Sequence, residues 1–225
     1  VDQRLPARAK AALLDEMAPS WVVDQTGRNA RADGRDTESG DALVVATSGS
    51  TGTPKGVVLT HEAVAASARA TSERLQVDRN DTWLACLPLS HVGGLSVVTR
   101  ALVTGTPLVV HDGFDAARVT AAAADGATLV SLVATALRRI DPTLFRVIVL
   151  GGSRPPADRP ANTIATYGLT ETGSGVVYDG RPVDGEQGVA GIPLALQCLH
   201  ELRAAGEIDR DQIRHSAETR RECPE

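Results

Sequence analysis

The chain has 225 residues, of which 23 are lysine or arginine and 28 are aspartate or glutamate, so its formal net charge is −5. This negative charge argues against nucleic acid or an anionic membrane surface as a general partner. Its 3 cysteines include no C-x-x-C pair, so a disulfide framework or zinc site is not expected. No run approaches the roughly 18 apolar residues of a membrane span, and the N-terminus is not a signal peptide, so we expect a cytoplasmic protein without membrane insertion.

Apolar positions over residues 7–17 are spaced for an amphipathic helix, 21–23 reads as a strand, and 24–41 reads as a polar connection. From residue 43 onward, strands and helices alternate. The expected strands are 43–46, 56–60, 82–86, 107–110, 127–132 and 146–150, and the expected helices are 61–75, 94–104, 115–124 and 133–140. This alternation predicts an α/β fold with a largely parallel sheet and helices on both faces.

The strands at 43–46, 82–86 and 146–150 are each followed by a polar or glycine-rich segment. Ligands of open α/β sheets bind in the crevice at the carboxyl ends of the strands. We therefore expect the three segments to lie at one edge of the sheet.

The first of these segments is a hydroxyl- and glycine-rich loop that ends in a lysine. Its residues are Thr47, Ser48, Gly49, Ser50, Thr51, Gly52, Thr53, Pro54, Lys55 and Gly56. Glycines let backbone N–H groups converge, hydroxyls add donors and Lys55 adds positive charge, so the loop is suited to phosphate. A flexible linker is disfavoured by the flanking strands. No Ser or Thr follows the lysine, which disfavours a kinase or GTPase.

Three further segments follow this loop in the chain. They are Leu87-Pro88-Leu89-Ser90-His91-Val92-Gly93-Gly94-Leu95-Ser96, Val149-Leu150-Gly151-Gly152-Ser153 and Tyr167-Gly168-Leu169-Thr170-Glu171-Thr172. Together the four segments resemble the signatures of the adenylate-forming superfamily of acyl-CoA synthetases, luciferases and peptide-synthetase adenylation domains. Within that superfamily, the chain looks most like the o-succinylbenzoate–CoA ligases of menaquinone synthesis.

The resemblance implies an ATP-dependent acid–CoA ligase, with a small carboxylic acid, ATP and CoA as its partners. It places the phosphates of ATP at the loop from Thr47 to Lys55. It places the adenine or the acyl group against the backbone of Gly151, Gly152 and Ser153, with the Tyr167 ring and Gly168 beside the adenine. It further implies that Thr170 contacts the α-phosphate and that Glu171 binds Mg²⁺, for which a carboxylate is a suitable ligand.

Each of these residues also has a structural interpretation. A lone histidine is more often structural than catalytic, but the resemblance places His91 beside the acyl and phosphate pocket, where it would donate to the reacting carboxylate or gate its entry. Glu171 alone would be a solvated loop acid, and Gly151-Gly152-Ser153 could simply end a strand. None of the motifs contains a basic residue that indicates a dicarboxylic acid.

The resemblance divides the chain into a partial AMP-binding core at residues 1–182 and a poorly matching segment at 183–225, expected to hold part of a β subdomain and a frayed tail. The superfamily's C-terminal domain supplies a lysine for adenylation, but no lysine follows Lys55. We therefore expect a truncated chain. The alternative is a catalytically degenerate nucleotide-binding module that keeps the fold without turnover.

Overall fold

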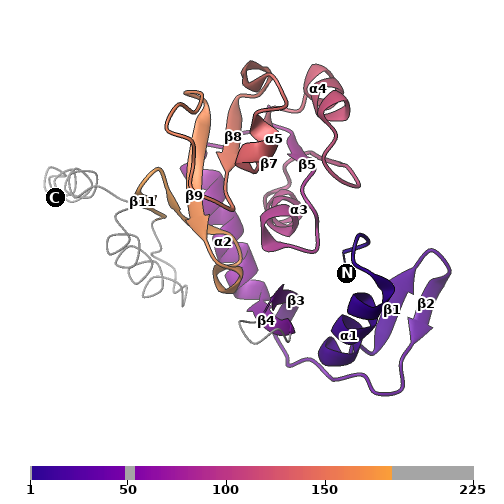
Figure 1. Ribbon diagram of the computed structural model, residues 1–225. Helices are drawn as coiled ribbons and strands as arrows, with labels where there is room; N and C mark the ends of the chain where they lie inside the picture. Colours follow the sequence, from indigo (N-terminus) through magenta and orange to yellow (C-terminus); the bar gives the residue numbers. More distant parts are fainter. Residues whose placement is uncertain (1, 49–53, 184–225) are drawn as a thin grey trace, which may run out of the picture.

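Figure 1 shows a computed structural model of the protein, which describes residues 2–48 and 54–183. The helices are α1 (Ala7–Met17), α2 (His61–Arg74), α3 (Val92–Thr104), α4 (Ala116–Ala124) and α5 (Ala134–Leu137), with 3-10 turns η1 (Pro142–Leu144) and η2 (Thr170–Thr172). The strands are β1 (Trp21–Asp24), β2 (Gly27–Ala30), β3 (Asp41–Ser48), β4 (Pro54–Thr60), β5 (Trp83–Ala85), β6 (Leu108–Val110), β7 (Leu129–Leu132), β8 (Val147–Leu150), β9 (Thr163–Gly168), β10 (Gly175–Tyr178) and β11 (Arg181–Pro182). Residues 49–53 of the phosphate loop and nearly all of the expected segment at 183–225 lie outside the described residues.

The main element is a seven-stranded sheet with the order β11-β10-β9-β8-β7-β5-β6. Strands β5 to β9 pair in parallel, and β10 and β11 add an antiparallel edge. Parallel neighbours need crossover connections, which α3, α4 and α5 provide here. The prediction of an α/β fold with a largely parallel sheet is confirmed.

Alternating side chains of the central strands build a core on each face of this sheet. Leu84 and Ile148 pack with α4 and α5 on one face. Their strand neighbours Trp83 and Val149 pack with α3 and the end of α2 on the other. Figure 1 shows α4 and α3 on either side of β5 and β7. Helices therefore cover both faces, as expected for a parallel sheet whose strands are almost entirely apolar.

The strands around the phosphate loop do not belong to this sheet, so their predicted place in it was wrong. β3 and β4 form a separate antiparallel hairpin in which Val44 faces Val58. A connection this short can join antiparallel strands, whereas parallel strands need a crossover of a dozen or more residues. The hairpin packs instead against α1, α2 and η2.

Two local expectations also need correction. Residues 24–41 are not only a connection, because β2 pairs with β1 in a hairpin. The helix expected at 133–140 is limited to α5. Helix α2 is capped by Thr60, whose hydroxyl accepts a hydrogen bond from the backbone N–H of Ala63 at 3.1 Å.

Cys86 follows β5 and is a free thiol within the core. Burial raises the pKa of this thiol to about 11. Because the thiolate is the reactive form, Cys86 is expected to resist iodoacetamide at pH 8 in the native protein and to react once urea unfolds it. Peptide mass spectrometry measures the difference, and equal labelling in both states would contradict the burial.

Candidate active site

A cavity of about 330 Å³ opens at the carboxyl ends of β5, β7, β8 and β9. Four predicted site residues line it: His91, Gly151, Gly152 and Gly168. The remaining lining residues include Leu87, Pro88, Ser96, Arg100, Ser131, Val133, Thr166, Ser174 and Gly175. The predicted second, third and fourth segments therefore meet at one edge of the sheet. Ligands of open α/β folds usually bind at this edge.

His91 lies where the chain turns from β5 into α3. It is the N-cap residue of α3 and is exposed. The turn before it is tight, because a Cβ atom at Gly94 would collide with the backbone carbonyls of Leu87 and Pro88. The glycine thus lets α3 start directly over the end of β5, which holds His91 at the cavity.

Gly151 and Gly152 end β8 and form one wall of the cavity. The backbone N–H of Gly151 donates to the carbonyl of Leu132 at 3.1 Å, which continues the pairing of β8 with β7. Gly152 adopts φ +81°, a conformation that favours glycine. Ser153 is exposed and is not among the cavity residues.

The turn after β9 carries the predicted α-phosphate and magnesium residues beside the cavity. Thr170 is half-buried, Glu171 is exposed, and neither is among the cavity residues. Turn η2 packs against β4, the strand that contains Lys55. The fold therefore brings Glu171 and the hairpin of the phosphate loop into neighbouring positions, although the hairpin is separate from the sheet.

The described part of the phosphate loop consists of its two ends. Ser48 pairs with Pro54 where β3 and β4 meet the loop, and the Thr47 hydroxyl donates to the carbonyl of Lys55 at 3.3 Å. Lys55 is exposed. Gly49, Ser50, Thr51, Gly52 and Thr53 lie outside the described residues, so their predicted phosphate contacts stay predictions.

Arg100 is a charged cavity residue that the sequence analysis did not identify. It lies on the buried side of α3 and is only 3% exposed. Its Nη2 donates to the hydroxyls of Ser96 at 3.0 Å and Ser174 at 2.7 Å, and its guanidinium carbon lies 5.1 Å from the centre of the Trp83 ring. Sequence reasoning usually assigns a charged residue of an expected helix to the face exposed to solvent. The signal against that assignment is that Arg100 falls on the apolar side of its helix.

The positive charge of Arg100 has no carboxylate partner among the described residues. Its Nε and Nη1 atoms are buried and have no hydrogen-bond partner within residues 2–48 and 54–183. Burial lowers the pKa of this guanidinium, but arginine remains charged in proteins. An uncompensated charge beneath a cavity attracts an anion, because its field is poorly screened in a low-dielectric interior.

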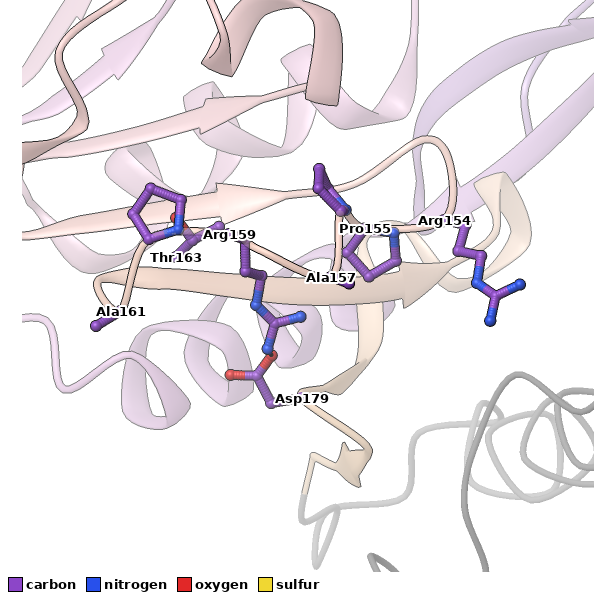
Figure 2. A pocket seen from close by; sticks show the side chains of 9 residues that line it. Arg154, Pro155, Ala157, Arg159, Ala161, Thr163 and Asp179 are labelled. Atoms are coloured by element: carbon purple, nitrogen blue, oxygen red, sulfur yellow. Dashed lines mark hydrogen bonds and ion pairs between the residues drawn. The ribbon is translucent and has the colours of Figure 1, made fainter.

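A second hollow of about 520 Å³ lies beside the segment that joins β8 to β9. Figure 2 shows Arg159 pointing toward Asp179, with which it forms an ion pair at 2.5 Å, while Arg154 points away. The Asp179 carboxylate also accepts the backbone N–H of Ala165 at 2.9 Å. None of the predicted site residues that the structure describes lines this hollow, and its ion pair between Arg159 and Asp179 fixes the end of β10.

Within the described residues, no three His, Cys, Asp or Glu side chains gather as a metal site. A magnesium ion at Glu171 would therefore depend on phosphate oxygens and water for its other ligands, as Mg²⁺ sites at nucleotides commonly do. No helix in the described ranges has the length and apolar character needed to cross a membrane.

The sequence profile of the family described as AMP-binding enzyme matches residues 2–202. The 2-succinylbenzoate–CoA ligase of Enterococcus faecalis is 38% identical over 152 residues, covering 60% of this chain and 31% of the relative. The 2-succinylbenzoate–CoA ligase of Bacillus anthracis is 33% identical over 182 residues, covering 73% of this chain and 38% of the relative.

A solved structure of the o-succinylbenzoate–CoA synthetase of Bacillus subtilis in complex with ATP and magnesium ion matches with a TM-score of 0.56. It is 31% identical, and the match covers 67% of this chain and 35% of that chain. The matched part of this chain thus spans about a third of the length of each of these three relatives. Because the family profile covers most of the sequence and the fold agrees, the chain belongs to the AMP-binding enzyme family.

Proposed function

We propose that this chain forms the acid- and nucleotide-binding part of an ATP-dependent acid–CoA ligase, and that its acid is a dicarboxylate of the 2-succinylbenzoate kind. The observation that supports the acid class is Arg100, a buried guanidinium that lines the cavity beside His91 and has no carboxylate partner within the described part of the chain. 2-Succinylbenzoate, the acid in the names of the relatives, carries two carboxylates. One carboxylate would react with ATP while the Arg100 guanidinium binds the other.

In the proposed reaction, an oxygen of one carboxylate attacks the α-phosphorus of ATP, and the bond from that phosphorus to the bridging oxygen breaks to release pyrophosphate. The sulfur of CoA then attacks the acyl carbon, loses its proton and displaces AMP. Both steps bring anions together, so positioned donors and positive charge are the main requirement. A magnesium ion bound with ATP at Glu171 would supply further charge neutralisation.

The site residues have different proposed roles in this reaction, according to their positions. His91 stands at the mouth of the cavity, where an imidazole could donate a hydrogen bond to the reacting carboxylate. Gly151 and Gly152 leave room for a ligand against their backbone. Thr170 is proposed to donate to the α-phosphate, and Lys55 to the terminal phosphates. The cavity volume of about 330 Å³ lies in the range typical of small-molecule sites.

The test is Arg100→Met, which keeps a long side chain but removes the charge. By calorimetry on the full chain, its dissociation constant for 2-succinylbenzoate is expected to rise by about 10- to 100-fold, because hydrogen bonds to charged groups contribute about 1.5–3 kcal/mol. Affinity for Mg·ATP should change little. Arg69→Met, which removes an exposed arginine of α2, is the matched control. Equal affinity in wild type and Arg100→Met would refute the dicarboxylate assignment.

The alternative, a nucleotide-binding module without turnover, is less well supported, because the relatives named above are acid–CoA ligases or synthetases. Acid-dependent exchange of labelled pyrophosphate into ATP separates the two functions. Exchange by the wild-type chain would refute the inactive module. A folded chain that binds no ATP would refute both.

A further inference from the structure

Ser174 connects the Arg100 guanidinium to the turn that carries Glu171. Its hydroxyl accepts the hydrogen bond from Arg100 Nη2 at 2.7 Å, and its carbonyl accepts one from the Thr172 hydroxyl at 2.7 Å. The Thr172 hydroxyl oxygen in turn accepts the backbone N–H of Leu169 at 2.9 Å. Leu169 and Thr172 flank Thr170 and Glu171, so this short chain of hydrogen bonds runs from the floor of the cavity to both sides of the turn.

The packing around Ser174 leaves little room for independent movement. Ser174 is 5% exposed and Thr172 is 9% exposed. A Cβ atom at Gly168 would collide with the carbonyl of Ser174, which shows how closely the two segments of the turn approach each other. A shift of Ser174 would therefore be passed to the turn, because close-packed contacts transmit strain.

Ser96 offers a natural comparison within the same site. Its hydroxyl accepts from the same Nη2 atom at 3.0 Å, but it lies on α3, the helix that also carries Arg100. The two serines thus make nearly equivalent hydrogen bonds to the guanidinium. Only the bond to Ser174 reaches the turn.

We propose that Ser174 is a positioning residue that couples the acid pocket to the magnesium- and nucleotide-binding turn. An acid anion over Arg100 holds the guanidinium in one position, and through Ser174 and Thr172 this orders the turn around Glu171. The acid therefore tightens the binding of Mg·ATP, and Mg·ATP tightens the binding of the acid by the same factor, since linkage is reciprocal. This inference rests on the proposed function, because it requires both ligands at these places.

The test measures the dissociation constant of Mg·ATP by calorimetry on the full chain, with and without saturating 2-succinylbenzoate. In the wild type the acid is expected to tighten ATP binding by about 5-fold or more, the lower end of typical coupling between sites. In Ser174→Ala the factor should fall below about 2-fold. Ser96→Ala, the matched control, should weaken binding of the acid while keeping the coupling factor of the wild type.

Amide hydrogen exchange of residues 169–175 gives a readout that does not depend on affinity. The acid should slow exchange there in the wild type and in Ser96→Ala, but not in Ser174→Ala. If Ser174→Ala does not fold, Ser174→Cys takes its place, because it keeps the side-chain shape with a much weaker acceptor.

The outcomes separate this inference from the function on which it rests. A wild-type chain that binds neither ligand overturns both. A chain that binds both ligands with no coupling, or with the same coupling in Ser174→Ala, overturns the inference alone. Equal loss of coupling in Ser96→Ala and Ser174→Ala also overturns it, because the orientation of Arg100 would then be sufficient and no connection to the turn would be needed.

Discussion

Replacing Arg146 by methionine is expected to lower the free energy of unfolding by about 3 kcal/mol, since it leaves the buried carboxylate of Asp81 without a compensating charge. Arg146 Nε donates to Asp81 Oδ1 at 2.8 Å, and its Nη2 contacts Oδ2. The Asp81 side chain is only 2% exposed, whereas that of Arg146 is 41% exposed. Loss of the arginine thus leaves a buried carboxylate, which is the costly half of the pair.

The location of this pair explains why its loss should affect the whole fold. Asp81 precedes β5, Thr128 precedes β7 and Arg146 precedes β8. The Thr128 hydroxyl donates a hydrogen bond to the Asp81 carboxylate at 2.7 Å. One carboxylate therefore joins the starts of three neighbouring parallel strands, at the edge opposite the cavity. Urea unfolding measures the loss. Arg138→Met, at an exposed arginine, should stay within about 0.5 kcal/mol of wild type.

The pH dependence of this effect has a definite sign. Burial by itself raises the pKa of Asp81, but hydrogen bonds from Arg146, the backbone of Asp78 and Thr128 outweigh it and leave the pKa below its usual value. A carboxyl with a lowered folded pKa contributes stability that is present above its unfolded pKa of about 3.9 and is lost as the pH falls through the folded pKa. The difference between wild type and Arg146→Met should therefore narrow as the pH falls from 7 to 3. A constant difference would contradict the assigned ion pair.

The part of the fold that could be predicted from the sequence is the part governed by local pattern. Apolar runs such as Val147–Leu150 alternate with helical segments, and every strand from β5 to β8 lies close to its predicted place. The β3–β4 hairpin was misplaced because an apolar strand looks the same in a sheet and in a separate hairpin. Its short connection was the physical signal that decides between them.

In the candidate site, too, some residues could be predicted from local sequence motifs and others could not. His91, Gly151, Gly152 and Gly168 could be placed from motifs, because each ends or follows a strand at one edge of the sheet. Arg100 could not, because its partner Ser174 is distant in the sequence and its charge is buried. Only the tertiary structure brings these residues together. The expectation that no basic residue in the motifs indicates a dicarboxylic acid concerned the motif positions only, and Arg100 lies outside them.

Replacing Glu171 by glutamine is expected to lower acid-dependent ATP–pyrophosphate exchange by about 100-fold, the scale of losing a group that stabilises developing charge. The substitution keeps size and hydrogen-bonding capacity but removes the carboxylate that we propose for magnesium. Glu171 is exposed on η2, so the fold should not change. Exchange of labelled pyrophosphate into ATP, with 2-succinylbenzoate as the acid, measures the effect. Glu73→Gln, at an exposed glutamate of α2, is the control.

A binding experiment distinguishes a magnesium ligand from an acid that merely faces solvent. The wild type should bind ATP more tightly with magnesium than with EDTA, and Glu171→Gln should lose most of that difference. In EDTA no metal neutralises Glu171 on either interpretation, so the substitution should leave the binding of metal-free ATP equal or somewhat tighter, because it removes a charge that repels the phosphates. Full retention of the magnesium effect in Glu171→Gln would assign Glu171 to solvent and leave the magnesium to the nucleotide alone.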